Sequence, residues 1–323
     1  MTSQHPLASA NVLVTGGAGF IGSHLVRELV RRGVGRVVVL DSLRYGDPGN
    51  LGALSDNVRL VKHTLGFDDR AELERALDGV SYVFHLAAEK HNQSKDDPAR
   101  VYRANLEGTH TLYEVAAAAG VKKVVFSSSL YAYGRMKGEP FSETEIPKPQ
   151  TVYGITKLAG EHVLRFFEVQ HGMEWNALRY LFVYGPKQFA GMGYKSVIVK
   201  NFERLLAGQP PTVYGDGSQT LDYVYVDDVV DATIAAMEQG VSKEVLNVGS
   251  GNATSVAMLI DRMIAVSGKQ VEKQFEPPDW TAGTTRVGNV DKIARVLGWK
   301  ARTSLDEGLA RTFAWISEHS AGT

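Results

Sequence analysis

Short apolar runs alternate with longer amphipathic stretches along the first half of the chain. The apolar runs have the length of buried strands, and they cover residues 12–14, 36–40, 58–62, 80–86 and 121–127. The other stretches carry apolar residues at helical spacing, over residues 20–32, 68–77, 98–119 and 153–169. Because parallel strands need helical crossovers, this alternation predicts an α/β fold with a doubly wound parallel sheet.

The first predicted strand ends in a glycine-rich turn, Thr15-Gly-Gly-Ala-Gly-Phe-Ile-Gly22, which leads directly into a predicted helix. In such a turn Gly16 lets the chain reverse sharply, Gly19 lets the backbone approach a pyrophosphate, and Gly22 lets the helix pack closely on the sheet. The helix N-terminus adds free N–H groups and the positive end of a dipole. The turn therefore predicts a Rossmann-type site for a dinucleotide.

The next strand ends at Asp41, close to the spacing at which a carboxylate binds an adenosine ribose. An acid there favours the free 2′-hydroxyl of NAD and repels the 2′-phosphate of NADP. Arg44, just beyond it, leaves some room for NADP. A glycine turn with a purely structural role is the other alternative, and the strand before it and the helix after it argue against that reading.

Beyond about residue 183 the regular alternation loosens, and prolines at 186, 210–211 and 277–278 mark loops. Helices over residues 196–207, 256–267 and 305–317 and a short strand over 212–214 predict a smaller, mixed α/β part. We expect an NAD-binding Rossmann domain over residues 1–182, with residues 224–250 packing back on it, and a C-terminal substrate-binding domain over residues 183–323.

Composition narrows the function classes. The chain has 323 residues, 44% of them hydrophobic, which suffices for a sizeable core. A formal net charge of −1 gives no electrostatic reason to expect a nucleic-acid partner or an anionic membrane. The chain has no cysteine, so thiolate chemistry, disulfides and Cys-based metal sites are excluded. Residues 1–10 lack the apolar core of a signal peptide, no run is long enough to span a membrane, and we expect a cytoplasmic protein.

A tyrosine, a lysine and a serine suggest the chemistry. Tyr153 and Lys157 lie one turn apart on a predicted helix, so they share a face. A free phenol is a poor base at neutral pH, but a lysine ammonium and an oxidised nicotinamide both favour the phenolate. Ser129, which closes a Ser-Ser-Ser strand end, could hold the same substrate oxygen. These residues predict proton removal from a carbinol coupled to hydride transfer to the nicotinamide.

With these motifs the chain resembles the extended short-chain dehydrogenase/reductase superfamily, and within it the NAD-dependent sugar-nucleotide epimerase/dehydratase family. It looks most like the UDP-glucose 4-epimerase branch. Besides the glycine turn, the matching stretches are His85-Leu-Ala-Ala88, Asn105-Leu-Glu-Gly-Thr109, Phe126-Ser-Ser-Ser129, Tyr153-Gly-Ile-Thr-Lys157, Tyr184-Gly-Pro186, Tyr214-Gly-Asp-Gly217 and Asp222-Tyr-Val-Tyr-Val-Asp-Asp228.

The resemblance implies a role for each matching position. Tyr153 would be the catalytic base, Lys157 would bind the nicotinamide ribose, and Ser129 would be the hydroxyl partner. The implied cofactor contacts are Gly16, Gly19, Phe20, Ile21, Gly22, Asp41, Leu86, Ala87, Ala88, Lys90, Asn105, Ser127, Tyr153 and Lys157. The implied substrate contacts are Ser128, Ser129, Tyr131, Phe182, Lys195, Tyr214, Leu221 and Arg286.

The chain departs from the family pattern in three ways. Phe182 and Leu221 stand where the family has an asparagine and an arginine that contact the substrate diphosphate. Losing these groups would weaken an ordinary UDP-sugar site unless Lys187, Lys195 or Arg286 compensates. Leu130 and Tyr131 stand where 4,6-dehydratases carry an Asp-Glu pair, and the decarboxylase branch also keeps the glutamate. Both of those reactions are therefore disfavoured.

The leading hypothesis is epimerisation of a nucleotide-diphosphate sugar at C4 through a 4-keto sugar, with retained NAD. A sugar-nucleotide or polyol dehydrogenase or reductase that exchanges its cofactor is the alternative, and a non-catalytic NAD-binding regulator is a third class. The resemblance also implies a homodimer that pairs the helices over 98–119 and 153–169. We expect no metal: His85 and His91 are assigned to the cofactor's surroundings or the core, and Trp299 to the core.

Overall fold

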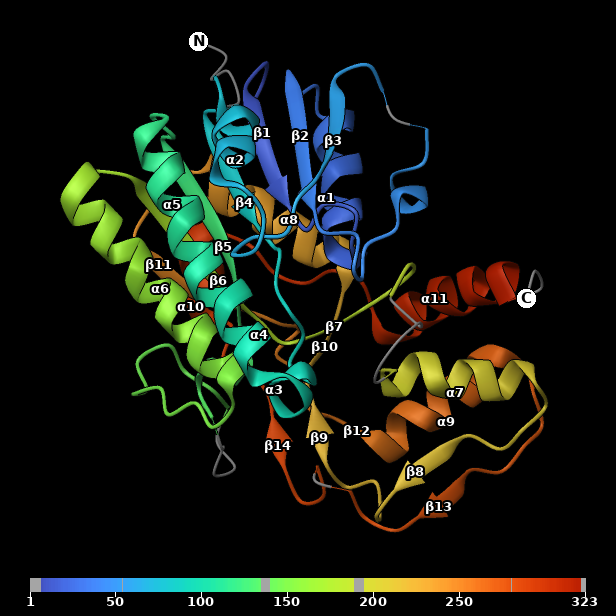
Figure 1. Cartoon of the computed structure of the whole chain (residues 1–323). Coiled ribbons are helices and arrows are strands. Elements are labelled where there is room, and N and C mark those ends of the chain that lie inside the picture. The colour runs from blue at the N-terminus through green and yellow to red at the C-terminus, as the bar shows by residue number, and fades with distance from the viewer. Residues whose placement is uncertain (1–6, 54, 135–139, 189–194, 280, 321–323) are drawn as a thin grey trace.

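The computed structural model describes residues 7–53, 55–134, 140–188, 195–279 and 281–320 (Figure 1). At its centre is a seven-stranded sheet in the order β11-β6-β5-β4-β1-β2-β3, in which every pair of neighbours is parallel. Its strands are β1 (Asn11–Thr15), β2 (Arg36–Asp41), β3 (Val58–Lys62), β4 (Tyr82–His85), β5 (Lys123–Ser129), β6 (Glu174–Tyr180) and β11 (Glu244–Val248). The strand order reverses between β1 and β4, which confirms the doubly wound sheet and creates the crevice in which such folds bind ligands.

Helices cover both faces of this sheet, because its strands bury side chains on both sides. Val12 and Val14 point to one face and Leu13 to the other. The face of Val12 is covered by α1 (Phe20–Arg31), α8 (Val226–Glu238) and α10 (Asp291–Leu297). The face of Leu13 is covered by α2 (Arg70–Leu77), α5 (Gly108–Ala118) and α6 (Val152–His171).

One central strand, β6, is not predicted from the sequence pattern. Its sequence, Glu-Trp-Asn-Ala-Leu-Arg-Tyr, places two polar residues in what is a buried strand. Asn176 is satisfied by donating to the carbonyl oxygens of Ala236 and Val241, both at 2.8 Å. Arg179 pairs with the buried Glu161. Because both partners lie far away in the sequence, the local pattern gives no sign that these polar residues can be buried.

The stretch predicted as one α-helix over 98–119 is interrupted. It consists of α4 (Pro98–Tyr102), a π-helical turn (Arg103–Glu107) and α5. A Cβ at Gly108 would lie 2.7 Å from the carbonyl carbon of Leu65, so the helix passes unusually close to the segment after β3. A π-turn inserts one extra residue per turn, and here it holds Asn105, whose side chain binds the backbone of Glu89.

The rest of the chain forms a smaller part beyond the carboxyl ends of the large sheet (Figure 1). Its buried core joins α7 (Val197–Leu206), α9 (Val256–Ser267) and α11 (Leu305–Ser320). Its short strand pairs are β7 (Phe182–Tyr184) with β10 (Tyr223–Tyr225), and β8 (Thr212–Tyr214) with β13 (Gln274–Glu276). A three-stranded sheet joins β12 (Thr254–Ser255), β9 (Thr220–Leu221) and β14 (Thr285–Arg286). Short helical turns complete the described chain: Pro48–Leu51, α3 (Gln93–Asp96) and Leu130–Ala132.

Candidate functional site

Two adjoining cavities lie at the carboxyl ends of the large sheet. The first, of about 440 Å³, lies over the glycine turn that follows β1. The second, of about 540 Å³, extends into the smaller part between α7, β8 and β9. The residues that line both cavities include Phe20, Lys90, His91, Tyr131 and Phe182. A long ligand that reaches across this boundary would contact both parts of the chain.

The glycine turn forms a cradle that side chains would fill. Gly16 has φ +70°, and a Cβ there would lie 2.8 Å from the backbone nitrogen of Ala87. A Cβ at Gly22 would lie 2.1 Å from the Gly16 carbonyl oxygen. No side chain caps the N-terminus of α1, so its N–H groups remain available to an anion. This cradle fits the diphosphate of a dinucleotide.

Asp41 lies beside this cradle. It is buried, and its carboxylate accepts hydrogen bonds from the backbone N–H groups of Ala18 at 2.9 Å and Leu43 at 2.8 Å. Burial raises the pKa of this carboxyl above its usual range. Arg44, the residue that could have favoured NADP, donates instead to the Tyr45 hydroxyl and lies 3.5 Å from Glu89.

The first cavity brings together nearly all of the residues that the sequence suggests as cofactor contacts. They are Gly16, Gly19, Phe20, Ile21, Gly22, Asp41, Leu86, Ala87, Ala88, Lys90, Ser127, Tyr153 and Lys157. Asn105 differs, because it is buried behind the cavity and does not line it. Its amide accepts from the Glu89 N–H at 2.7 Å and donates to the Glu89 carbonyl at 3.0 Å, so it positions the cavity wall.

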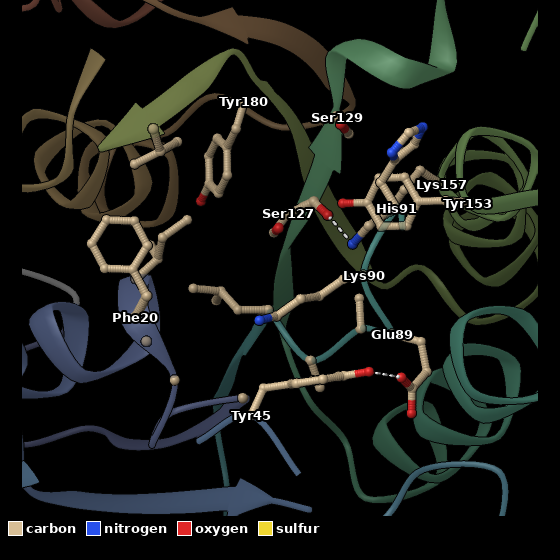
Figure 2. Close-up of a pocket in the computed structure, with 18 of the residues that line it drawn as sticks. Phe20, Tyr45, Glu89, Lys90, His91, Ser127, Ser129, Tyr153, Lys157 and Tyr180 are labelled. Atoms are coloured by element: carbon tan, nitrogen blue, oxygen red, sulfur yellow. Dashed lines mark hydrogen bonds between the residues drawn. The ribbon is translucent and has the colours of Figure 1, made fainter. Parts of the chain in front are cut away.

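Tyr153, Lys157 and Ser129 converge in the first cavity, next to His91 and Tyr131, which line both cavities (Figure 2). Tyr153 and Lys157 lie in the first turns of α6, which is capped by the Thr151 hydroxyl, and Ser129 is the last residue of β5. The Lys157 ammonium lies 5.6 Å from the centroid of the Tyr153 ring and donates to the Ser127 carbonyl at 2.6 Å. Ser129 hydrogen-bonds to Tyr153 through their side chains.

Burial sets the proton affinities of this group. It raises the pKa of Tyr153 to about 12, although the hydrogen bond from Ser129 acts in the opposite direction. It lowers the pKa of Lys157 to about 7. A buried phenol of high pKa needs a positive charge beside it before it can act as a base near neutral pH. Lys157 and a cationic group in the first cavity would both supply that charge.

The low pKa of Lys157 predicts a pH dependence of stability in the cofactor-free protein. An unfolded lysine keeps its proton up to a pKa near 10.4. Between about pH 7 and pH 10 the unfolded chain therefore binds a proton that folded Lys157 does not, and the free energy of unfolding rises with pH. In Lys157→Met this rise should be smaller, which urea unfolding at pH 7 and pH 9.5 will measure. An equal rise in both proteins would contradict the assignment.

An aromatic pair forms the wall next to Tyr153. The rings of His91 and Tyr131 are stacked with centroids 3.8 Å apart, and each lies 6.0 Å from the Tyr153 ring, edge to face. Burial and the nearby Arg286 guanidinium lower the pKa of His91. His85 is different: it is buried between the hydroxyls of Thr15 and Thr109, at 2.7 and 2.9 Å. Of the two histidines, His91 therefore faces the cavities and His85 belongs to the core.

The second cavity contains the residues suggested as substrate contacts in the smaller part. Phe182, Lys195, Tyr214, Leu221 and Arg286 all line it. Lys195 forms an ion pair with Glu203 at 2.6 Å. Sequence reasoning missed Lys200, which lies on α7, lines the same cavity and donates to the Tyr214 hydroxyl at 2.6 Å. The only sequence signal for Lys200 is its position on an amphipathic helix.

Arg286 lies beside Leu221 on the neighbouring strand. β14 pairs with β9 in parallel, and Arg286 is the register partner of Leu221. Side chains of register partners point to the same face of a sheet, and both of these residues line the second cavity. The structure therefore brings a guanidinium next to the position at which the family pattern has its arginine.

The side chains of three other residues named in the sequence analysis are directed away from the two cavities. The Ser128 hydroxyl points into the protein and donates to Glu161, although Ser128 also borders the first cavity. Lys187 donates to the Asn50 carbonyl and lines neither cavity. Trp299 belongs to the core, as expected. In the part of the chain that the structure describes, no cluster of three metal-binding side chains occurs and no helix has the length and apolar character of a membrane span.

Comparisons with known proteins agree with this geometry. Residues 12–249 match the model of the NAD dependent epimerase/dehydratase family. A UDP-glucose 4-epimerase from Mycolicibacterium smegmatis is 37% identical over 314 residues, which cover 95% of this chain and 99% of the relative.

Solved structures give the same result. The UDP-glucose 4-epimerase of Thermotoga maritima, solved with UDP-glucose, is 39% identical with a TM-score of 0.89, over 96% of this chain and 99% of that one. The UDP-glucose 4-epimerase of Thermus thermophilus, solved with NAD, is 34% identical with a TM-score of 0.85, over 95% of this chain and 99% of that one.

Proposed function

This chain belongs to the NAD-dependent epimerase/dehydratase family, and we propose that it epimerises a nucleotide-diphosphate sugar at C4 through a 4-keto sugar. NAD is its cofactor, and we propose that it stays bound between turnovers. The observation that carries this proposal is the convergence of Ser129, Tyr153 and Lys157 in the cavity over the dinucleotide cradle, next to the His91–Tyr131 pair that also lines the second cavity.

Each of the three residues receives a role in proton handling. Ser129 and Tyr153 hold the C4 oxygen between their hydroxyls, and the Tyr153 phenolate removes the proton from that oxygen. Lys157, held by the Ser127 carbonyl, supplies positive charge beside the phenol and binds the nicotinamide ribose. NAD, when bound, supplies the group that accepts and returns a hydride. Tyr153 later returns its proton to the C4 oxygen of the inverted sugar, so the reaction needs no net oxidant.

Dehydration and decarboxylation are poorly supported by the residues around Tyr153. Expelling the 6-hydroxyl of a sugar as water requires a carboxyl group that can donate a proton to it. At positions 130 and 131 this chain has Leu130, which is buried, and Tyr131, which is stacked on His91. A phenol in an aromatic stack is a poor substitute for the acid, and epimerisation asks for no such group.

We propose that Arg286 replaces the diphosphate clamp that Leu221 lacks. A guanidinium binds phosphate oxygens through a planar pair of N–H donors, and its exact place in a strand matters less than the surface it reaches. Arg286 lies beside Leu221 in register on β14 and lines the same cavity. In this chain the arginine would therefore come from β14, whereas the family pattern has it at the position of Leu221 on β9. Lys195, Lys200 and Tyr214 also line that cavity.

A swap of the two side chains tests this assignment. Arg286→Leu should raise KM for a UDP-sugar about 10- to 100-fold, because a charge-assisted hydrogen bond contributes about 1.5–3 kcal/mol. Adding Leu221→Arg to that variant should recover most of the loss, and steady-state kinetics of the single and double variants will measure it. An unchanged KM in Arg286→Leu would contradict the transposed clamp.

The remaining proposals concern organisation. We propose that residues 1–182, with 224–250, hold the cofactor, and that the rest of 183–323 holds the substrate. We also propose a homodimer that pairs the α4–α5 and α6 surfaces, because α6 exposes Ile155, Phe166 and Val169 to solvent. We propose that the protein is located in the cytoplasm, because NAD and nucleotide sugars are cytoplasmic metabolites.

The proposed function is tested by incubating the purified protein with UDP-, dTDP-, GDP- and CDP-sugars without added NAD. A product of unchanged mass with inverted C4, identified by NMR, is the expected result. Loss of water or carbon dioxide would instead indicate a dehydratase or decarboxylase. Turnover that requires added NAD would indicate a dehydrogenase.

A further inference from the structure

Two segments that flank the glycine turn meet each other at the first cavity. The strand order is β4-β1-β2, so the segments after β2 and after β4 lie on either side of the turn that follows β1. Tyr45 belongs to the segment after β2 and Glu89 to the segment after β4. The Tyr45 hydroxyl donates to a carboxylate oxygen of Glu89 at 2.8 Å, and both side chains line the cavity that the glycines also line (Figure 2).

The Glu89 end of this bridge is firmly held. Its backbone N–H and carbonyl are both bound by the buried Asn105 amide in the π-turn. The Nε of Arg100 donates to the other carboxylate oxygen of Glu89 at 2.6 Å. Glu89 itself is only 5% exposed. A carboxylate fixed in this way is a pre-organised acceptor, and Arg100 offsets its charge next to a cradle for phosphates.

The Tyr45 end is held by cations and by close backbone packing. The Lys90 ammonium lies 4.3 Å from the centroid of the Tyr45 ring, and Arg44 Nε donates to the Tyr45 hydroxyl at 3.2 Å. A Cβ at the next residue, Gly46, would lie 2.8 Å from the Asp41 carboxylate. The segment therefore packs directly on Asp41, the residue proposed to bind the adenosine ribose. The bridge thus connects both walls of the cradle.

We propose that the Tyr45–Glu89 bridge is a clasp that closes over bound NAD and slows its release. The bridge joins the two segments across the carboxyl end of β1, where the glycine turn holds the diphosphate. A dinucleotide can leave that turn only after the segments separate, which requires the phenol–carboxylate hydrogen bond to break. This proposal depends on the proposed function, because an NAD molecule that is regenerated within each turnover does not have to leave the protein.

The test measures cofactor exchange rather than turnover. The holoenzyme is mixed with excess isotopically labelled NAD, and replacement of the bound NAD is followed by mass spectrometry. Tyr45→Phe keeps the ring against Lys90 and removes only the hydroxyl, so we expect exchange about 10- to 100-fold faster than in the unaltered protein.

Two further variants separate the clasp from general damage. Tyr82→Phe, at the amino end of β4 and away from the cavities, is the matched control and should exchange at the unaltered rate. Glu89→Ala, which removes the acceptor, should accelerate exchange, and adding it to Tyr45→Phe should give little further acceleration because the bond is already gone. Unchanged exchange in Tyr45→Phe, or accelerations that simply multiply in the double variant, would overturn the clasp. Exchange of NAD can be measured even if no tested sugar is epimerised, so the two proposals fail separately.

Discussion

Tyr153→Phe is expected to lower kcat for epimerisation about 10²- to 10⁴-fold, the usual contribution of a positioned general base. The substitution removes only the oxygen that, as a phenolate, is proposed to take the proton from the C4 oxygen. Because the ring stays against His91 and Tyr131, the protein should keep its fold, and because Lys157 keeps its bond to the Ser127 carbonyl, it should also keep its NAD. Single-turnover kinetics and the NAD content of the purified variant will measure both effects.

Tyr133→Phe is the matched control for this prediction. Tyr133 is also a buried tyrosine of raised pKa, about 12, and its hydroxyl donates to the Asn247 side chain at 2.8 Å. Removing it leaves a buried amide oxygen without that donor and should cost about 1–3 kcal/mol of stability while the chemistry continues. A Tyr153→Phe enzyme that turns over at the rate of the Tyr133→Phe enzyme would remove Tyr153 from the mechanism.

Glu161→Ala is expected to destabilise the protein by about 3–5 kcal/mol. Glu161 lies one turn beyond Lys157 on α6, and its carboxylate accepts from Arg179 of β6 at 2.9 and 2.7 Å. Both side chains are about 4% exposed, so the alanine variant would leave a buried guanidinium without its counter-charge. It would also leave the Ser128 hydroxyl without its acceptor. Urea unfolding will measure the loss.

The exposed pair of Arg70 with Glu114 provides the comparison. Its side chains are 45% and 47% exposed, and Glu114→Ala should change the free energy of unfolding by at most about 1 kcal/mol. Equal losses in the two variants would show that Glu161 is not the buried counter-charge that the structure indicates. If Glu161→Ala kept its stability but lost its activity, the main role of the Glu161–Arg179 pair would instead be to position Lys157.

The sequence predicts the large sheet well because its signals are local. Most of its strands are short apolar runs, and most of its helices are amphipathic stretches between turn residues. Two features that the sequence pattern does not predict have a common cause. β6 buries Asn176 and Arg179 with the help of partners on α6, on α8 and between α8 and β11, and the π-turn holds Asn105, whose side chain binds Glu89. Neither pattern can be recognised without knowing which distant residues meet.

The candidate site divides in the same way. The glycine turn directly follows β1, and Tyr153 and Lys157 lie one turn apart on a single helix, so the chemistry they suggest can be derived from neighbouring residues. Arg286 could be named as a source of compensation, but its place beside Leu221 depends on the register of β14 with β9. The bridge from Tyr45 to Glu89 likewise joins segments on either side of β1, and only the strand order brings them together.

The central claim is that C4 of a nucleotide sugar would be oxidised and then reduced again within one active site, in which the glycine turn, Asp41 and Lys157 would hold a retained NAD as the hydride carrier. It is tested most directly with a UDP-sugar carrying deuterium at C4, incubated in ordinary water without added NAD. We expect the C4 epimer to keep its deuterium, as measured by NMR and mass spectrometry. An epimer that has lost the deuterium to solvent, or a keto product that accumulates only with added NAD, would contradict the claim.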